Sequence, residues 1–213
     1  TLQMMPRVKT THVQASARSS ISWDHVAGLD EARAEMEEIV DFLRDSKRFA
    51  RLGARVPKGI LLYGPPGTGK THTIHYLARA LEGHTTFLIS AEQVGLLSEY
   101  MTLARLLQPS IVVMEDVDLI ARERTEMGSP VEEVLLNKLL NEMDGLAEDA
   151  DVIFVLTTNR IELLEPALAM RPGRIDQAVE IKLPDAECRR RLLELYLRDL
   201  PGVVPDLALE PIV

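Results

Sequence analysis

A glycine-rich segment of eight residues, 64–71, constrains the fold of this 213-residue chain more than any other feature. It reads Gly-Pro-Pro-Gly-Thr-Gly-Lys-Thr and matches the pattern G-x-x-x-x-G-K-S/T. The apolar run 59–63 comes directly before it, and a stretch with helical periodicity, 71–81, follows it. A buried strand that enters a tight turn and continues as a helix explains this order.

The same segment has the composition of a phosphate cradle. Gly67 and Gly69 let the backbone curl so that N–H groups point at phosphate oxygens, and the following helix adds the positive end of its dipole. Lys70 would supply a mobile charge to the β- and γ-phosphates, and Thr71 a hydroxyl for Mg²⁺. We therefore expect ATP or ADP with Mg²⁺ here. The predicted nucleotide contacts in this part of the chain are Pro66, Gly67, Thr68, Gly69, Lys70, Thr71 and His72.

Strands and helices are predicted to alternate along the chain. Besides 71–81, helical periodicity is found at 30–44, 98–107, 131–143 and 185–200. Besides 59–63, short apolar runs typical of buried strands are found at 86–90, 111–114, 152–157 and 178–181. This alternation favours an α/β fold in which helices cover both faces of a parallel sheet. The last helix lies beyond the final strand and is expected to begin a small lid.

The predicted strand 111–114 ends in two acidic residues, Glu115 and Asp116. In enzymes with such a phosphate cradle, carboxylates at this place hold the Mg²⁺ shell and polarise the attacking water. We expect this strand beside the strand 59–63, with Glu115 and Thr71 on the metal side, partly through water, and Asp116 as the activating carboxylate. If the strand continued, Asp118 would point to the same side as Asp116. The alternative is a pair of acids that only caps a strand at the surface.

Composition excludes several classes of protein. The single cysteine, Cys188, rules out an internal disulfide and a four-cysteine zinc site, and it favours a reducing, cytoplasmic compartment. No apolar run reaches the roughly 18 residues of a membrane span. The net charge of −9 argues against a bulk electrostatic grip on nucleic acid. Residues 1–20 contain three basic residues and no acid, which indicates either a flexible arm or a tether that docks on a neighbouring subunit or on another part of the same protein.

As a set, the motifs resemble an AAA+ ATPase domain. The resemblance is greatest to the branch that includes the FtsH-type protease ATPases, the proteasomal ATPases and the valosin-containing-protein-like unfoldases. It runs from about Ile21 to Pro184 and weakly onward to Pro205. The segments that carry it are 23–29 before the first helix, the cradle 64–71, the inter-subunit signalling segment 139–146, the sensor-1 strand end 157–160, and the second region of homology, 166–176.

This resemblance implies further site residues. His25, Val26 and Ala27 would lie against the adenine, and Asn159 would position water and read the γ-phosphate. Arg171 and Arg174 would be arginine fingers, and a planar guanidinium suits the charge that develops in phosphoryl transfer. In the alternative interpretation these arginines lie in a solvated loop and pair with acidic neighbours. The family also implies a ring, expected to be a hexamer, that remodels or unfolds a protein substrate or works with an adaptor.

The sequence departs from the family pattern at three places. The acid pair is ordered Glu115–Asp116 where the family has Asp then Glu, which predicts slower hydrolysis. No aromatic residue precedes Val94–Gly95, where the family has a loop that grips polypeptide, and the following stretch is about ten residues short. There is no H-E-x-x-H motif, so we interpret His72 and His75 as ordinary helix residues rather than zinc ligands. The chain itself is therefore not expected to be a metalloprotease.

The expected organisation has three parts. They are a basic arm at 1–20, the AAA+ core, a P-loop NTPase fold, at 21–184, and the beginning of a helical lid at 185–213. The expected activity is ATP hydrolysis. Two alternatives remain open from the sequence: a nucleotide-binding scaffold that scarcely hydrolyses ATP, and a P-loop kinase that remodels no protein.

Overall fold

The computed structural model describes residues 30–45, 48–49, 57–119, 130–146, 150–164 and 175–197. The helices are α1 (Asp30–Arg44), α3 (Lys70–Ala80), the 3-10 helix η2 (Ala91–Leu96), α4 (Leu97–Leu106), α6 (Pro130–Asp144) and α8 (Ala186–Leu197). The strands are β1 (Gly59–Tyr63), β2 (Thr85–Ile89), β3 (Ser110–Met114), β4 (Val152–Thr158) and β5 (Gln177–Glu180). Strands and helices alternate as predicted, and the ends of most elements differ by one residue at most. The last three residues predicted for the final helix, 198–200, lie outside the described residues.

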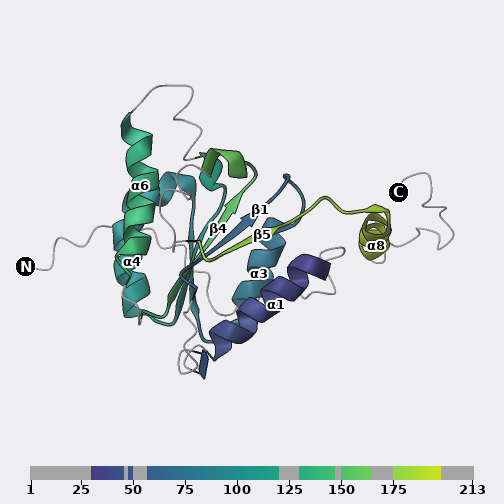
Figure 1. Cartoon of the computed structure of the whole chain (residues 1–213), viewed down its shortest axis with the longest axis horizontal. Helices are drawn as coiled ribbons and strands as arrows, with labels where there is room; N and C mark the ends of the chain where they lie inside the picture. Colours follow the sequence, from purple (N-terminus) through teal and green to yellow (C-terminus); the bar gives the residue numbers. More distant parts are fainter. Residues whose placement is uncertain are drawn as a thin grey trace, which may run out of the picture.

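The strands form one parallel sheet in the order β2-β3-β4-β1-β5 (Figure 1). The predicted α/β fold, with a parallel sheet between helices, is therefore confirmed. The expectation that β3 lies beside β1 is wrong, because β4 lies between them. β4 pairs with β1 from Gly59↔Phe154 to Tyr63↔Thr158, and it pairs with β3 from Ser110↔Val152 to Met114↔Leu156. The end of β4 thus separates the end of β1, which leads into the cradle, from the acids that follow β3.

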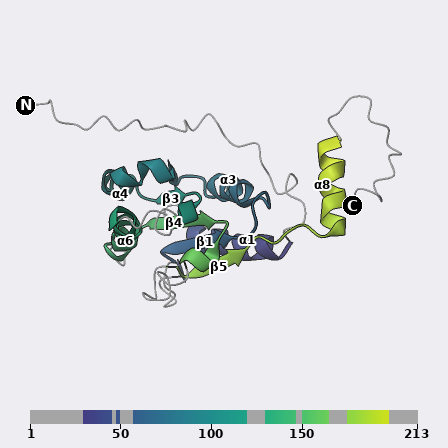
Figure 2. The ribbon, with the colours of Figure 1, turned by 90° about the horizontal axis from the view of Figure 1, so that it is seen from above.

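Helices cover both faces of the sheet (Figure 2), and a hydrophobic layer lies on each face between the sheet and its helices. Side chains alternate along each strand, so in β1 Leu61 faces α4 and α6, whereas Ile60 and Leu62 face α1 and α3. The α1 stripe predicted from periodicity is buried in the second layer: Met36, Ile39, Val40 and Leu43. The central strands β3 and β4 are buried along their whole length, as expected for a parallel sheet covered on both sides.

Helix α8 stands apart from the sheet in both ribbon views (Figures 1 and 2). The chain leaves β5 with a hydrogen bond from the Ile181 N–H to the Tyr63 carbonyl, and α8 begins after Asp185, whose carboxylate accepts from the Cys188 N–H at 2.8 Å. None of the described α8 side chains is buried, and Tyr196 is 67% exposed. Within the part of the chain that the structure describes, no helix is long and apolar enough to cross a bilayer.

Candidate active site

The turn after β1 has the backbone that the glycine-rich sequence predicts. Gly67 and Gly69 have φ of 77° and 104°, in the region that favours glycine. Sequence reasoning missed the requirement at Gly64, whose φ is 145°. A Cβ built at Gly64 would lie 2.2 Å from the carbonyl oxygen of Ile181, so the turn packs directly against the chain that leaves β5.

Helix α3 begins within this turn with its first backbone N–H groups available to a ligand. Gly69 is the N-cap and makes no side-chain capping hydrogen bond, and the first turn of α3 contains no acid. The Thr68 hydroxyl could itself bind an anion, but here it donates to the Pro65 carbonyl at 2.8 Å. Unsatisfied N–H groups at the positive end of a helix form an anion-binding site.

Lys70 lies inside the cradle and is only 7% exposed. Its Nζ donates to the carbonyl oxygens of Gly64 and Pro65, both at 2.8 Å. Burial lowers the pKa of Lys70 below 10.5, and the carboxylates of Asp116 and Asp118 oppose that effect by raising it. Phosphate oxygens are stronger acceptors for an ammonium group than peptide carbonyls, so the cradle supplies a cation that a polyphosphate can recruit.

The two acids after β3 have different partners. The Thr71 hydroxyl donates to Glu115 Oε1 at 2.7 Å, which joins this carboxylate to the start of α3. Asn159 Nδ2 donates to Asp116 Oδ1 at 2.9 Å, which joins the second carboxylate to the end of β4. The two carboxylates are therefore held by different elements, Glu115 by a hydroxyl of α3 and Asp116 by the amide that follows β4.

Strand β3 does not continue through these acids. Asp116 has φ 50°, a conformation uncommon for a residue with a side chain, and its N–H donates to Thr157 Oγ1 at 3.0 Å. The next residues form a short helical turn, so the condition for the alternation considered for Asp118, a strand that continues, is not met. Asp118 instead turns inward and is 3% exposed. In the sequence, the signal for Asp118 was a third acid only two residues after the acid pair. Its burial implies hydrogen-bond partners, because buried carboxylates are normally hydrogen-bonded.

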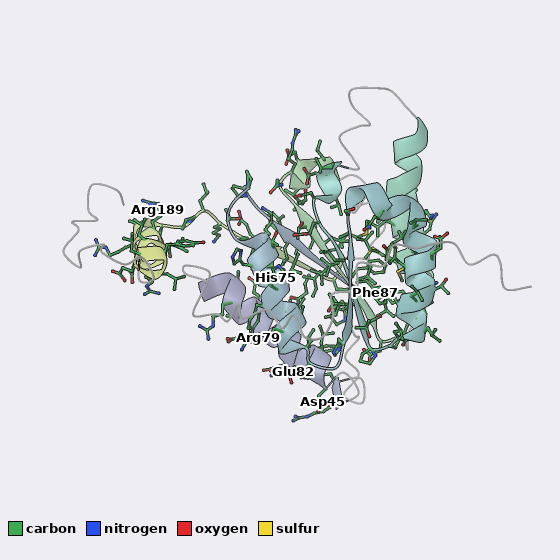
Figure 3. The ribbon with its side chains drawn as sticks, turned by 180° about the vertical axis from the view of Figure 1, so that it is seen from behind. Asp45, His75, Arg79, Glu82, Phe87 and Arg189 are labelled. Atoms are coloured by element: carbon green, nitrogen blue, oxygen red, sulfur yellow. The ribbon has the colours of Figure 1, made fainter. Side chains whose placement is uncertain are left out.

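The other predicted site residues are only partly placed. His72 lies exposed on α3, and so do His75 and Arg79, which Figure 3 labels on that helix. No group of three or more histidine, cysteine or acidic residues that could hold a metal is found within the described ranges. The candidate adenine contacts His25, Val26 and Ala27, and the candidate fingers Arg171 and Arg174, lie outside the described residues.

In the segment after β2, where the resemblance predicts a loop that grips polypeptide, part of the chain packs inward and Leu96 is 38% exposed. Val94 of η2 is fully buried, and Lys138 Nζ on α6 donates to the Gly95 carbonyl at 2.8 Å. The nearest aromatic residue in sequence, Tyr100, is buried edge-on against Phe87 with ring centroids 6.5 Å apart. Among the described residues of this segment, 93–100, no aromatic side chain projects into solvent.

Comparison with known proteins adds a family to this geometry. The family described as "ATPase family associated with various cellular activities (AAA)" matches residues 60–183, which span the cradle, the acid pair and the end of β4. The chain belongs to this AAA family. The predicted recognition as an AAA-type ATPase domain is thereby confirmed.

Several curated relatives of this AAA domain carry FtsH names. The chain is 43% identical over 194 residues to "ATP-dependent zinc metalloprotease FtsH 2" of Sphaerobacter thermophilus, covering 85% of this chain and 29% of that protein. It is 42% identical over 217 aligned positions to FtsH 3 of the same organism, covering 96% and 43%. It is 41% identical over 201 residues to FtsH of Pelobacter propionicus, covering 87% and 32%. The AAA domain described here thus spans less than half the length of these relatives.

Proposed function

We propose that this chain binds ATP with Mg²⁺ in the turn 64–71 and hydrolyses it with the acids that follow β3. The observation that carries the proposal is the divided pairing of those acids, with Thr71 bonded to Glu115 and Asn159 bonded to Asp116. Membership of the AAA ATPase family supports nucleotide binding and hydrolysis as the general activity. The assignment of the steps to individual residues is our own.

The donor set on the Glu115 side fits Mg²⁺. A hydroxyl oxygen of Thr71 and a carboxylate oxygen of Glu115 lie 2.7 Å apart, and Mg²⁺ prefers hard oxygen ligands of these kinds. Glutamate is one methylene longer than the aspartate expected from the family pattern, and with this length its carboxylate accepts from Thr71. When bound, the metal ion would neutralise charge on the phosphates.

The Asp116 side would activate the attacking water. The carboxylate Oδ1 is oriented by the amide of Asn159, and the other oxygen can accept a proton from a water that attacks the γ-phosphorus. The bond from that phosphorus to the bridging oxygen breaks, which leaves ADP and phosphate. Lys70 would leave the carbonyls of Gly64 and Pro65 for the β- and γ-phosphates.

Topology supports arginine fingers that act on a neighbouring subunit. Asp176 follows Arg174 by two residues, and its carboxylate accepts from the backbone N–H groups of Lys58 and Gly59 at the amino end of β1. The cradle follows the opposite end of β1, which is about 16 Å away for a five-residue strand. We therefore propose that Arg171 and Arg174 serve the site of another copy in a ring, expected to be hexameric.

The printed names of the relatives describe ATP-dependent zinc metalloproteases. We propose that the present domain supplies the ATP-driven part of a protein-remodelling cycle on a protein substrate or through an adaptor. Because ATP is supplied in the cytoplasm, we propose that the domain works there. A scaffold that binds ATP without hydrolysing it is the second candidate. The buried Val94 does not favour a loop that grips polypeptide, and the shorter catalytic acid, Asp116, does not favour fast turnover.

Nucleotide binding and turnover of Lys70→Ala test the proposed function. Calorimetry with Mg²⁺-ATP should show an affinity about 100-fold weaker or lost, because charge-assisted contacts to the phosphates disappear. Lys138→Ala is the matched control, since this lysine lies on α6 and contacts Gly95. Unchanged affinity in Lys70→Ala would reject the site, and binding without any turnover in the wild-type protein would favour the scaffold.

A further inference from the structure

The backbone pairing between β3 and β4 ends at Met114↔Leu156, directly before the acid pair that follows β3. Beyond that point side chains connect the two segments. Asp116 N–H donates to Thr157 Oγ1 at 3.0 Å, and Thr158 Oγ1 donates to Asp118 Oδ1 at 2.9 Å. The backbone N–H of Asn159 donates to the same Asp118 oxygen at 3.1 Å. Asp118 is therefore the acceptor on which the end of β4 is anchored.

The surroundings of Asp118 make this anchor rigid. Asp118 and Thr158 are both buried, and Thr158 Oγ1 in turn accepts from the Arg160 N–H at 3.0 Å. A buried acceptor that holds two donors on one oxygen has few alternative positions, because movement would leave those donors unsatisfied. The anchor thus fixes the backbone of Asn159 on both sides of its Cα, through its own N–H and through the N–H of the following residue.

The side chain of Asn159 then reaches Asp116 from this fixed backbone, with Nδ2 2.9 Å from Oδ1. Among the described residues no hydrogen bond joins Asp118 directly to Asp116, and the hydrogen-bonded connection between their carboxylates runs through Asn159. Thr158, which donates to Asp118, also accepts from the Gly64 N–H through its carbonyl at 3.3 Å, so Asp118 lies beside the cradle rather than in a remote part of the core.

We propose that Asp118 is a positioning residue for ATP hydrolysis: it holds Asn159 so that the amide orients Asp116 toward the attacking water. This inference rests on the function proposed above. Both hydrogen bonds from the end of β4 go to one oxygen, so an asparagine whose amide oxygen occupies the Oδ1 position can accept both. Acceptor position, rather than negative charge, is the property that the role requires.

Steady-state hydrolysis in the full chain, with wild type, Asp118→Asn, Asp118→Ala, Asn159→Ala and the double variant Asp118→Ala/Asn159→Ala, tests the proposal. Asp118→Ala should lower kcat about 100-fold, as expected for a displaced catalytic group, while KM changes less than about threefold. Asp118→Asn should restore kcat to within about fivefold of wild type. The double variant should be no slower than Asn159→Ala alone, because both changes interrupt one connection.

Each contrary result overturns the proposal. If Asp118→Asn is as slow as Asp118→Ala, charge is required, and if the double variant shows the product of the two single losses, Asp118 acts independently of Asn159. A lower melting temperature with normal kcat per folded site would reduce Asp118 to a structural role. If Asp118→Ala does not fold, the nearly isosteric Thr158→Val takes its place in the experiment. A normal kcat in Thr158→Val would then contradict the proposal.

A wild-type protein that binds ATP without turnover would contradict the proposed hydrolysis. It would not contradict the claim that Asp118 holds Asn159 against Asp116. A crystal structure of Asp118→Ala would then decide: Asn159 Nδ2 should move out of hydrogen-bond distance of Asp116. An unmoved Asn159 would overturn the positioning role.

Discussion

At the residue scale, the acids after β3 have partners that make them chemically distinct. Glu115 accepts from a hydroxyl at the start of α3, and Asp116 accepts from an amide at the end of β4. An oxygen beside Thr71 suits the metal side, whereas a carboxylate oriented by an amide suits proton transfer. The two acids should therefore not be interchangeable.

Asp116→Asn should keep nucleotide affinity within about threefold and lower kcat about 100-fold or more, because an amide cannot take the proton. Glu115→Gln should instead raise the Mg²⁺ concentration needed for half-maximal activity. Titrations of Mg²⁺ at saturating ATP separate the two effects. The exposed Glu82 provides the control Glu82→Gln, which should match wild type. If Glu115→Gln stops turnover and Asp116→Asn does not, the two roles are reversed.

The stability of the fold should depend on the protonation of His84. Its Nδ1 is buried and has no hydrogen-bond partner among the described residues. Burial lowers the pKa of His84 below 6.5, while the carboxylate of Asp151 acts in the opposite direction. Between the lower folded-state pKa and 6.5 the unfolded chain binds more protons, so the free energy of unfolding falls as pH decreases through this window.

His84→Gln should accordingly reduce the difference in melting temperature between about pH 7.5 and about pH 5.5, because it removes this titration. Calorimetry or circular dichroism at both pH values measures the effect. His75→Gln, at an exposed position on α3, is the control and should keep the wild-type difference. An equal pH dependence in wild type and His84→Gln would exclude His84 as the cause.

At the scale of the elements, the sequence predicted which segments are helices and strands but not how the strands are ordered. Periodicity reports whether a segment is buried on one face or on two, and it contains no information on its neighbours. The expectation that β3 lies beside β1 rests on analogy with enzymes that have such a cradle, and periodicity could not show that β4 lies between them. The helix η2 was also missed, although Ser90 and Gln93 form a capping box that marks its start.

The site shows the same division. The cradle and the acid pair were found from local spacing, because one short segment contains each of them. The contribution of Asp118 depends on Thr158 and Asn159, about 40 residues away in the sequence, and only the packing of β4 beside β3 brings them together. The positions of the candidate fingers and of the candidate adenine contacts remain predictions.

The contact between the cradle and the exit of β5 makes a prediction at this scale. Gly64→Ala should lower the free energy of unfolding by about 2–4 kcal/mol, because the new Cβ would meet the backbone oxygen of Ile181 and no side chain can move aside. Gly83→Ala is the matched control: Gly83 also has positive φ, at 95°, but nothing lies within 4 Å of its Cβ position.

Urea denaturation of both variants measures the difference. Gly83→Ala should lose about 1–3 kcal/mol from backbone strain alone, and Gly64→Ala should lose more than that in the same measurement. Equal losses in the two variants would mean that the close approach to Ile181 does not constrain the turn.

At the scale of the whole molecule, β1 connects two edges of the sheet with different roles. Its carboxyl end leads into the cradle. At its amino end, Asp176 accepts from the N–H groups of Lys58 and Gly59, and Lys58 Nζ donates to the Leu146 carbonyl at 3.1 Å. The end of the segment 139–146 and the residues after Arg174 therefore meet at the edge opposite the nucleotide. In the arrangement that we propose, the arginines of one subunit would serve a neighbour's cradle, and its own cradle would receive another subunit's arginines.

Activity in mixed assemblies of Arg174→Ala and Lys70→Ala subunits tests this account most directly. Neither variant should hydrolyse ATP alone, because one lacks the finger and the other lacks the cradle. Fingers of this kind contribute on the order of 10³–10⁵ in rate. We expect the mixture to regain part of the wild-type activity, since some interfaces pair an intact cradle with an intact finger. No recovery in assemblies shown to contain both subunits, or full activity in a proven wild-type monomer, would contradict a site completed by its neighbour.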